Sequence, residues 1–140
     1  MTDNTEVAAP RPMATTRDHL FGKLPFFDVV DSDEKVVIDL HNRQDLTNIR
    51  GALQGGLVAT LIDIAAGRLA VKYAGDLAGA ATADMTIHYL APIMEGPARA
   101  TATLVRAGRR SIVVAVDVVD MGADRHAARA TLSFAVLTAR

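Results

Sequence analysis

The sequence predicts an α+β domain in which a curved antiparallel sheet of about five strands wraps around one long central helix. Residues 54–73 form an apolar run with hydrophobic side chains on every helical face, which is typical of a helix enclosed by other elements. The rest of the chain contains five strand-like segments, and the short connections among the last of them favour antiparallel pairing. A sheet that curls around the helix covers most of its apolar surface, and a partner can cover the face that remains.

Each expected strand combines β-branched or alternating apolar residues with turn residues at its ends. The five segments are residues 34–41, 82–90, 98–106, 111–120 and 125–138. In the first of them Val36, Ile38 and Leu40 alternate along one face, so we expect this face to meet the helix. In the second, Met85 and Tyr89 lie on one face together with an isoleucine, and we expect both in the core rather than against a substrate.

We expect one domain, because 140 residues fit a single hydrophobic core. Residues 1–15 are largely polar and contain two prolines, so we expect a disordered tail, followed by a single domain over residues 16–140. Residues 16–24 predict a short helix that Pro25 interrupts.

Composition argues against several function classes. The formal net charge of −1 gives no reason to expect nucleic acid or an anionic membrane as a partner. There is no cysteine, which excludes disulfides, thiolate zinc sites and a cysteine nucleophile. No apolar run reaches membrane-spanning length, and the N-terminal segment lacks the apolar stretch of a signal peptide. We therefore expect a cytoplasmic protein without a membrane partner.

Asp63 is the most informative residue, because it is the only charged side chain between Arg50 and Arg68. A carboxylate within an apolar helix loses hydration, which is unfavourable unless the group is paired or hydrogen-bonded. Asp63 is therefore either a polar anchor of the structure or a group that the protein uses in chemistry.

Gly55 and Gly56 directly precede the apolar run, so they lie at the start of the expected helix. The first N–H groups of a helix have no intrahelical partner, and the helix dipole makes this end positive. Without side chains, these donors are open to a small ligand oxygen, as in oxyanion holes. The alternative interpretation is that paired glycines make a turn or permit close packing.

The spacing between Gly55 and Asp63 constrains any shared role. Eight residues correspond to about 12 Å along a helix axis, because each residue rises by about 1.5 Å. One reacting carbonyl cannot contact both groups of one helix. If they serve a single reaction, Gly55 of one chain must face Asp63 of another, which predicts a homodimer with two equivalent sites.

Three segments resemble hotdog-fold acyl-CoA thioesterases, and in particular the phenylacetate-pathway (PaaI-like) branch. These segments are residues 48–63 (NIRGALQGGLVATLID), 82–92 (TADMTIHYLAP) and 105–110 (VRAGRR). The resemblance extends over about residues 20–138, and its pattern is more specific for fold and superfamily than for substrate. It implies a hotdog fold, and it allows a homotetramer, because dimers of this family often pair again.

The resemblance also implies roles for individual residues. Asp63 matches the catalytic carboxylate, which acts as a general base on water or as a nucleophile on the thioester. Gly55 matches the glycine whose N–H polarises the thioester carbonyl, and Asn48 a polar residue that helps to place the thioester or the water. Thr82 matches a hydroxyl position near the carboxylate of the other subunit.

Two further sets of residues follow from the same resemblance. Arg106, Arg109 and Arg110 lie where family members often contact the phosphates of coenzyme A. The family usually has histidine immediately before the glycine pair, whereas this chain has Gln54. Glutamine donates and accepts hydrogen bonds but carries no proton near neutral pH, so Gln54 can only orient groups.

The leading hypothesis is therefore an acyl-CoA thioesterase that needs no metal and no cofactor, coenzyme A being part of its substrate. One alternative is a hotdog enzyme with another acyl-CoA reaction, such as hydration. Hotdog hydratases usually have an aspartate and a histidine a few residues apart ahead of the helix. Asp45 lies in that region, but no histidine follows it within reach. The other alternative is a non-catalytic acyl-CoA-binding or lipid-binding protein, which Gln54 keeps open.

Overall fold

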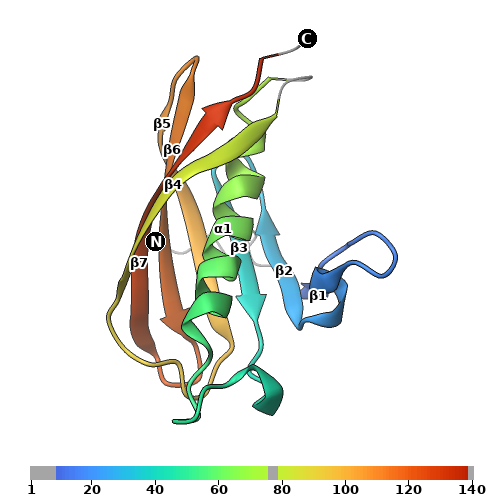
Figure 1. Cartoon of the computed structure of the whole chain (residues 1–140), viewed down its shortest axis with the longest axis vertical. Coiled ribbons are helices and arrows are strands. Elements are labelled where there is room, and N and C mark those ends of the chain that lie inside the picture. The colour runs from blue at the N-terminus through green and yellow to red at the C-terminus, as the bar shows by residue number, and fades with distance from the viewer. Residues whose placement is uncertain (1–8, 76–78, 139–140) are drawn as a thin grey trace.

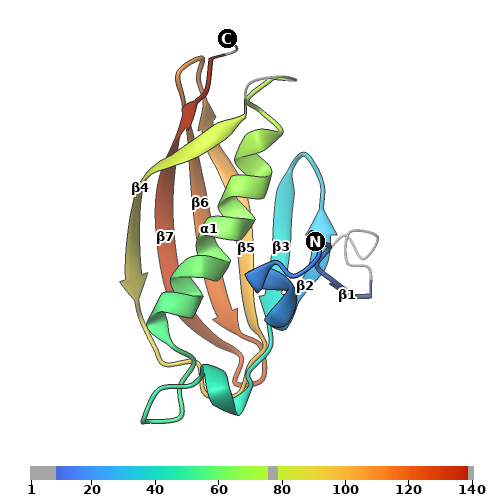
Figure 2. The same ribbon diagram turned by 45° about the vertical axis from the view of Figure 1, so that its right-hand side comes forward.

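The computed structural model describes residues 9–75 and 79–138, which form one long helix lying across an antiparallel sheet (Figures 1 and 2). The sheet has seven strands in the order β1-β2-β3-β5-β6-β7-β4. The strands are β1 (Arg11–Pro12), β2 (Phe26–Asp31), β3 (Lys35–Leu40), β4 (Ala80–Tyr89), β5 (Ala98–Ala107), β6 (Ser111–Asp120) and β7 (Arg125–Val136). The α+β class with one helix on an antiparallel sheet is confirmed, whereas the expected number of five strands is wrong.

The helix α1 (Gly55–Val71) confirms the expected helix over residues 54–73, with Gln54 as its N-cap. Its buried face packs mainly on β3, β5 and β6. The residues of this face are Val58, Leu61, Ile62, Ala65, Ala66, Leu69 and Ala70. The opposite face, which includes Thr60, Asp63, Ile64 and Gly67, is only partly buried in a single chain. Apolar side chains on every face therefore do not mean that this chain alone encloses its helix.

The meander expected among the last strands is present, because β5 pairs with β6 and β6 with β7. In β3, Val36, Ile38 and Leu40 are fully buried in the main core cluster, as their alternation predicted. The helix is part of the same cluster, so the core lies between α1 and one face of the sheet.

The two strands that the sequence did not predict lie at the N-terminal edge of the sheet. β2 has no regular alternation of apolar and polar residues, because its register with β3 shifts between Asp28 and Val30. β1 pairs with β2, and its two residues lie inside the segment that we expected to be a tail. Residues 1–8 of that segment lie outside the described residues.

The short helix expected over residues 16–24 is replaced by a 3₁₀ helix over Leu20–Lys23. Asp18 has a φ of +60°, in the left-handed region that a right-handed helix cannot contain. A second 3₁₀ helix, Gln44–Leu46, leads toward α1. No helix within residues 9–75 and 79–138 is long and apolar enough to span a bilayer.

β4 forms the other edge of the sheet and pairs only with β7. Met85 and Tyr89 do lie on one face of β4, because their partners on β7 are the core residues Leu132 and Ala128. Nevertheless Met85 is 36% and Tyr89 54% exposed. The expectation that both are core residues is therefore wrong, because β4 is an edge strand that this chain leaves uncovered.

Candidate active site

The start of α1 presents two backbone donors that have no partner within the described part of the chain. The N–H groups of Leu57 and Val58 bond to the carbonyl of Gln54, at 3.0 and 3.1 Å. Those of Gly55 and Gly56 have no acceptor among the described residues, and both glycines are exposed. The positive end of the helix dipole adds to the partial charge of these donors.

Packing does not explain why both positions are glycine. A Cβ atom added at Gly55 would come no nearer than 3.7 Å to the ring of Tyr89, and one at Gly56 would meet nothing within 4 Å. Both residues belong to the helix, and neither has the positive φ that favours glycine. The structure thus gives no support, within one chain, to the interpretation that the pair makes a turn or permits close packing.

Gln54 does not cap the helix with its side chain. Its Nε2 donates to the carbonyl oxygen of Thr47, at 3.3 Å. Gln54 therefore connects the start of α1 to the preceding loop through a neutral hydrogen bond.

Asn48 forms that loop. Its Oδ1 accepts hydrogen bonds from the N–H groups of Arg50 and Ala52, at 2.9 and 3.2 Å. Gly51 completes the turn with a φ of +83°, a conformation that glycine adopts without strain. With Oδ1 engaged, the amide of Asn48 can offer only its NH₂ group to a ligand, so it can donate to a carbonyl oxygen or a water.

Asp63 lies two turns further along α1 and is partly buried. Its Oδ1 accepts a hydrogen bond from the hydroxyl of Thr82 on β4, at 2.7 Å. The resemblance placed Thr82 near the carboxylate of the other subunit, whereas here it contacts Asp63 of its own chain. No other hydrogen bond to the Asp63 carboxylate occurs among the described residues, so one of its oxygens is open.

A cavity of about 320 Å³ lies beside the start of α1. Asn48, Gly55 and Tyr89 contribute polar atoms or backbone to its wall. The remainder of the wall is mostly apolar and comes from Ala52, Leu53, Val58, Leu90, Ala91, Pro92, Ile93 and Ala127. The cavity therefore combines an apolar surface with the first residue of the helix, Gly55, which suits a carbonyl compound with an apolar substituent.

Tyr89 is the residue of this cavity that the sequence did not reveal. Its hydroxyl donates to the carbonyl oxygen of Gly55, at 2.6 Å. Partial burial raises the pKa of Tyr89 above its ordinary value, so the hydroxyl keeps its proton at neutral pH. In the sequence, the one feature that pointed to Tyr89 was its position within residues 82–92, a segment that resembles the thioesterase family.

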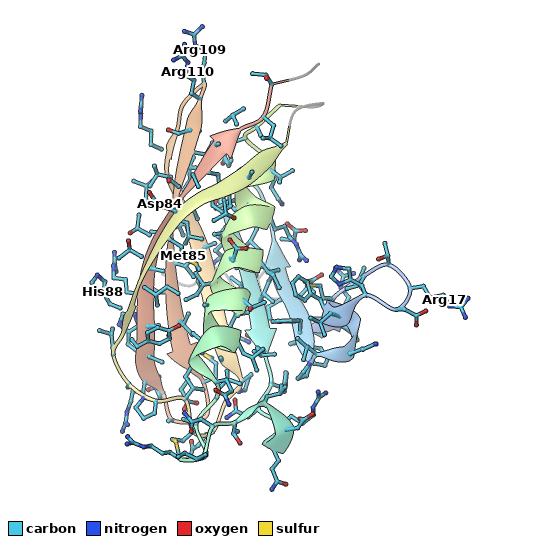
Figure 3. All side chains as sticks on the ribbon, in the orientation of Figure 1. Arg17, Asp84, Met85, His88, Arg109 and Arg110 are labelled. Atoms are coloured by element: carbon cyan, nitrogen blue, oxygen red, sulfur yellow. The ribbon has the colours of Figure 1, made fainter. Side chains whose placement is uncertain are left out.

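Arg106, Arg109 and Arg110 surround the turn between β5 and β6, together with Gly108 and Ser111. All three arginines are exposed. The turn lies at the end of the sheet where α1 ends, far from the start of α1, and Arg109 and Arg110 project from its tip (Figures 1 and 3). Within one chain the arginines and Gly55 therefore line separate cavities at opposite ends of the sheet. No group of three or more histidine, aspartate or glutamate side chains within residues 9–75 and 79–138 could hold a metal ion.

Several known proteins are similar to this chain in sequence or in fold. A protein of Saccharolobus solfataricus that carries the name esterase is 34% identical over 77 residues, which are 55% of this chain and 51% of that protein. The chain thus spans about half the length of that relative. A Bacillus halodurans protein whose structure was solved with CoA is 33% identical, with a TM-score of 0.69 over 72% of this chain and 66% of the other.

The PaaI protein of the phenylacetic acid degradation operon of E. coli shares the fold, with a TM-score of 0.75 and 18% identity. The match covers 83% of this chain and 82% of PaaI. The family model of the thioesterase superfamily matches residues 50–124, which are more than half of the 140 residues and include Gly55, Asp63 and Thr82. The chain therefore belongs to the thioesterase superfamily and has the hotdog fold of its members.

Proposed function

We propose that this protein hydrolyses an acyl-CoA thioester to a free acid and coenzyme A, with each active site built from two copies of the chain. The observation that carries the proposal is that the N–H groups of Gly55 and Gly56 have no partner among the described residues, at positions where packing within one chain does not require glycine. An oxygen that gains negative charge is stabilised by such fixed donors. Thioester hydrolysis develops this charge on the carbonyl oxygen.

The separation along α1 requires the second copy. Gly55 and Asp63 are about 12 Å apart along the axis, so the acid of one chain meets the donors of the other. β4 supplies the surface for this assembly, because it is an exposed edge strand with unpaired backbone groups on its outer side. The exposed side chains of Asp84, Met85 and His88 follow this edge (Figure 3).

The contacts within one chain favour antiparallel pairing of two copies of β4. Near one end of the strand Thr82 bonds to Asp63, and at the other end Tyr89 bonds to Gly55. A two-fold axis near Met85 and Thr86, midway between them, brings Thr82 and Asp63 of one chain opposite Tyr89 and Gly55 of the other. The same rotation brings the β5–β6 turn of the first chain, with Arg106, Arg109 and Arg110, toward the end where α1 of the second chain begins. These arginines could then meet the phosphates of coenzyme A.

The reaction follows from these positions. The Gly55 N–H polarises the thioester carbonyl, and the NH₂ group of Asn48 helps to place the thioester or the water. Asp63 of the partner chain takes a proton from a water whose oxygen attacks the carbonyl carbon, or its carboxylate attacks that carbon directly. The C–S bond then breaks, and the coenzyme A sulfur leaves and takes up a proton, which in the first route is the one that Asp63 removed from water. In the second route the acyl group stays on Asp63 as a mixed anhydride, which water hydrolyses to the free acid and the restored carboxylate. Thr82 holds the Asp63 carboxylate, and Gln54 holds the loop of Asn48.

The test is release of free thiol from a panel of short, aromatic and long acyl-CoA esters, with a pair of variants at Gly55. Gly55 is the first helical residue, where proline is tolerated and removes only an N–H that the helix does not use. Gln54 has a ψ of 131°, which suits a residue before proline. We expect Gly55→Pro to lower kcat about 10²- to 10³-fold, as loss of an oxyanion donor does. Gly55→Ala keeps the N–H and should lose much less.

Two results would contradict the proposal. No thiol release from any ester would leave a binding protein or an enzyme with another acyl-CoA reaction. A monomer in light scattering at micromolar concentration would exclude the shared site, whereas a dimer or a tetramer supports it.

A further inference from the structure

Tyr89 and Gly55 form a contact to which the proposed reaction gives no role. The tyrosine hydroxyl donates to the carbonyl oxygen of Gly55, at 2.6 Å. The ring lies 3.7 Å from the place where a Cβ of Gly55 would be. Tyr89 therefore flanks the first peptide group of α1 instead of packing in the core.

The carbonyl of Gly55 and the N–H of Gly56 belong to the same peptide group. A hydrogen bond accepted by the carbonyl polarises that group and makes its N–H a stronger donor, by about 10–30% in condensed-phase estimates. The Gly56 N–H has no acceptor among the described residues, and nothing lies within 4 Å of its missing side chain. The donor that Tyr89 strengthens is thus also open to a ligand.

We propose that Tyr89 is a positioning residue that fixes and polarises the peptide between Gly55 and Gly56, so that the Gly56 N–H acts as a second oxyanion donor beside that of Gly55. The inference rests on the proposed thioester hydrolysis. It assigns to the oxyanion two donors from consecutive residues, and it explains why the second position is also glycine. A side chain at position 56 would stand beside the donor that the oxygen must reach.

The variant Tyr89→Phe tests this role, because it removes the hydroxyl and keeps the ring against Gly55. Tyr73→Phe is a matched control. The hydroxyl of Tyr73 also donates to a backbone carbonyl, that of Asp33, near the opposite end of α1. Both variants lose the same kind of hydrogen bond, so they should lose similar stability in thermal unfolding.

The kinetic result should separate the two variants. We expect Tyr89→Phe to lower kcat about two- to eightfold, because the Gly56 N–H loses about 10–30% of its strength and a full oxyanion donor is worth about 10²- to 10³-fold in kcat. KM should stay within about twofold of the parent value, because the donor gains importance only as charge develops on the oxygen. Tyr73→Phe should change neither constant.

An independent readout is the amide proton of Gly56 in ¹⁵N-labelled protein without substrate. Its NMR signal should move upfield in Tyr89→Phe, because the peptide is less polarised, and should stay in place in Tyr73→Phe. An unmoved Gly56 signal would overturn the inference even if no thioester is ever hydrolysed. In an active enzyme, unchanged kcat, a change mainly in KM, or an equal loss in Tyr73→Phe would overturn it as well. If the Gly56 signal moves but no ester is hydrolysed, the proposed function is rejected, and with it the role of Tyr89 in the reaction. The effect of Tyr89 on the Gly56 peptide would still be established.

Discussion

Two aspartates of this chain sit in very different surroundings. Asp120, at the end of β6, is 1% exposed and accepts four backbone N–H groups. Met94, Glu95 and Gly96 donate at 3.0, 3.2 and 2.8 Å, and Ala123 donates at 3.3 Å. These donors hold together the loop before β5 and the turn after β6. Each of the two carboxylate oxygens accepts two of these hydrogen bonds, so all four acceptor sites of Asp120 are used.

Asp63 is only partly buried and receives one hydrogen bond, from Thr82. An ionised carboxylate can accept about four hydrogen bonds, so Asp63 keeps capacity to take a proton or to attack a carbon. The number of hydrogen bonds that each carboxylate accepts therefore distinguishes Asp120, which holds two loops together, from Asp63, which has acceptor sites left for chemistry. Burial alone would select Asp120, whereas the proposed function requires Asp63.

The largest expected effect comes from removing the available carboxylate. Asp63→Asn keeps an oxygen that can accept from Thr82 but loses the base and nucleophile. We expect kcat for thioester hydrolysis to fall about 10²- to 10⁴-fold, with the melting temperature nearly unchanged. The control is Asp124→Asn, at an exposed position whose φ of +49° suits asparagine equally well. Near-normal turnover in Asp63→Asn would make Asp63 a structural anchor.

For Asp120 we expect the reverse, a loss of stability with little change in activity. Asp120→Asn turns an NH₂ group toward backbone donors and leaves buried N–H groups unsatisfied. We expect unfolding in urea to show a loss of about 1–3 kcal/mol, while kcat per folded molecule stays within about twofold. A variant as stable as the parent would mean that the loop does not depend on this carboxylate.

Acid should affect stability through Asp120. Burial acts to raise the pKa of Asp120, but the four backbone N–H donors outweigh it, so this pKa lies below its ordinary value in the folded state. The resulting stabilisation is complete above the unfolded pKa of about 3.9 and is lost as the pH falls through the folded pKa. We expect melting temperatures measured from pH 7 to pH 2.5 to fall below about pH 4, and to fall less in Asp120→Asn. Parallel curves for the two proteins would contradict this assignment.

The smallest effect is expected when the hydroxyl of Thr82, which donates the single hydrogen bond to Asp63, is removed. Thr82→Val removes the hydroxyl and keeps a β-branched side chain on β4. We expect kcat to fall about three- to tenfold, because one hydrogen bond no longer orients the carboxylate. Thr131→Val, on the exposed face of β7, is the control and should leave kcat unchanged. An equal decrease in both variants would indicate a general effect on the sheet.

The sequence was sufficient for the helix and for the regular strands. The apolar run predicted α1 to within two residues at either end, and the valine-rich segment 111–120 matches β6 at both ends. These elements have a regular period that the local sequence shows directly. β2 escaped prediction because its irregular register with β3 disrupts the alternation.

The candidate site could be predicted in part. Gly55 and Asp63 stand out in the sequence, because a glycine pair and a lone charge interrupt a pattern. Tyr89 and Asp120 do not, since their roles depend on which segments the fold brings together. Alternation places Tyr89 on the core-facing side of a strand, but only the strand order shows that β4 is an edge. The donors of Asp120 come mostly from a loop about 25 residues earlier in the chain.

The distance along α1 between Gly55 and Asp63 has a genetic consequence under the proposed shared site. A chain carrying Gly55→Pro and a chain carrying Asp63→Asn would each be defective alone. When they are refolded together, a mixed dimer has one site with both defects and one site with none. If pairing is random, about a quarter of all sites are intact. Two inactive alleles would then complement each other in one cell, which no arrangement confined to a single chain would allow.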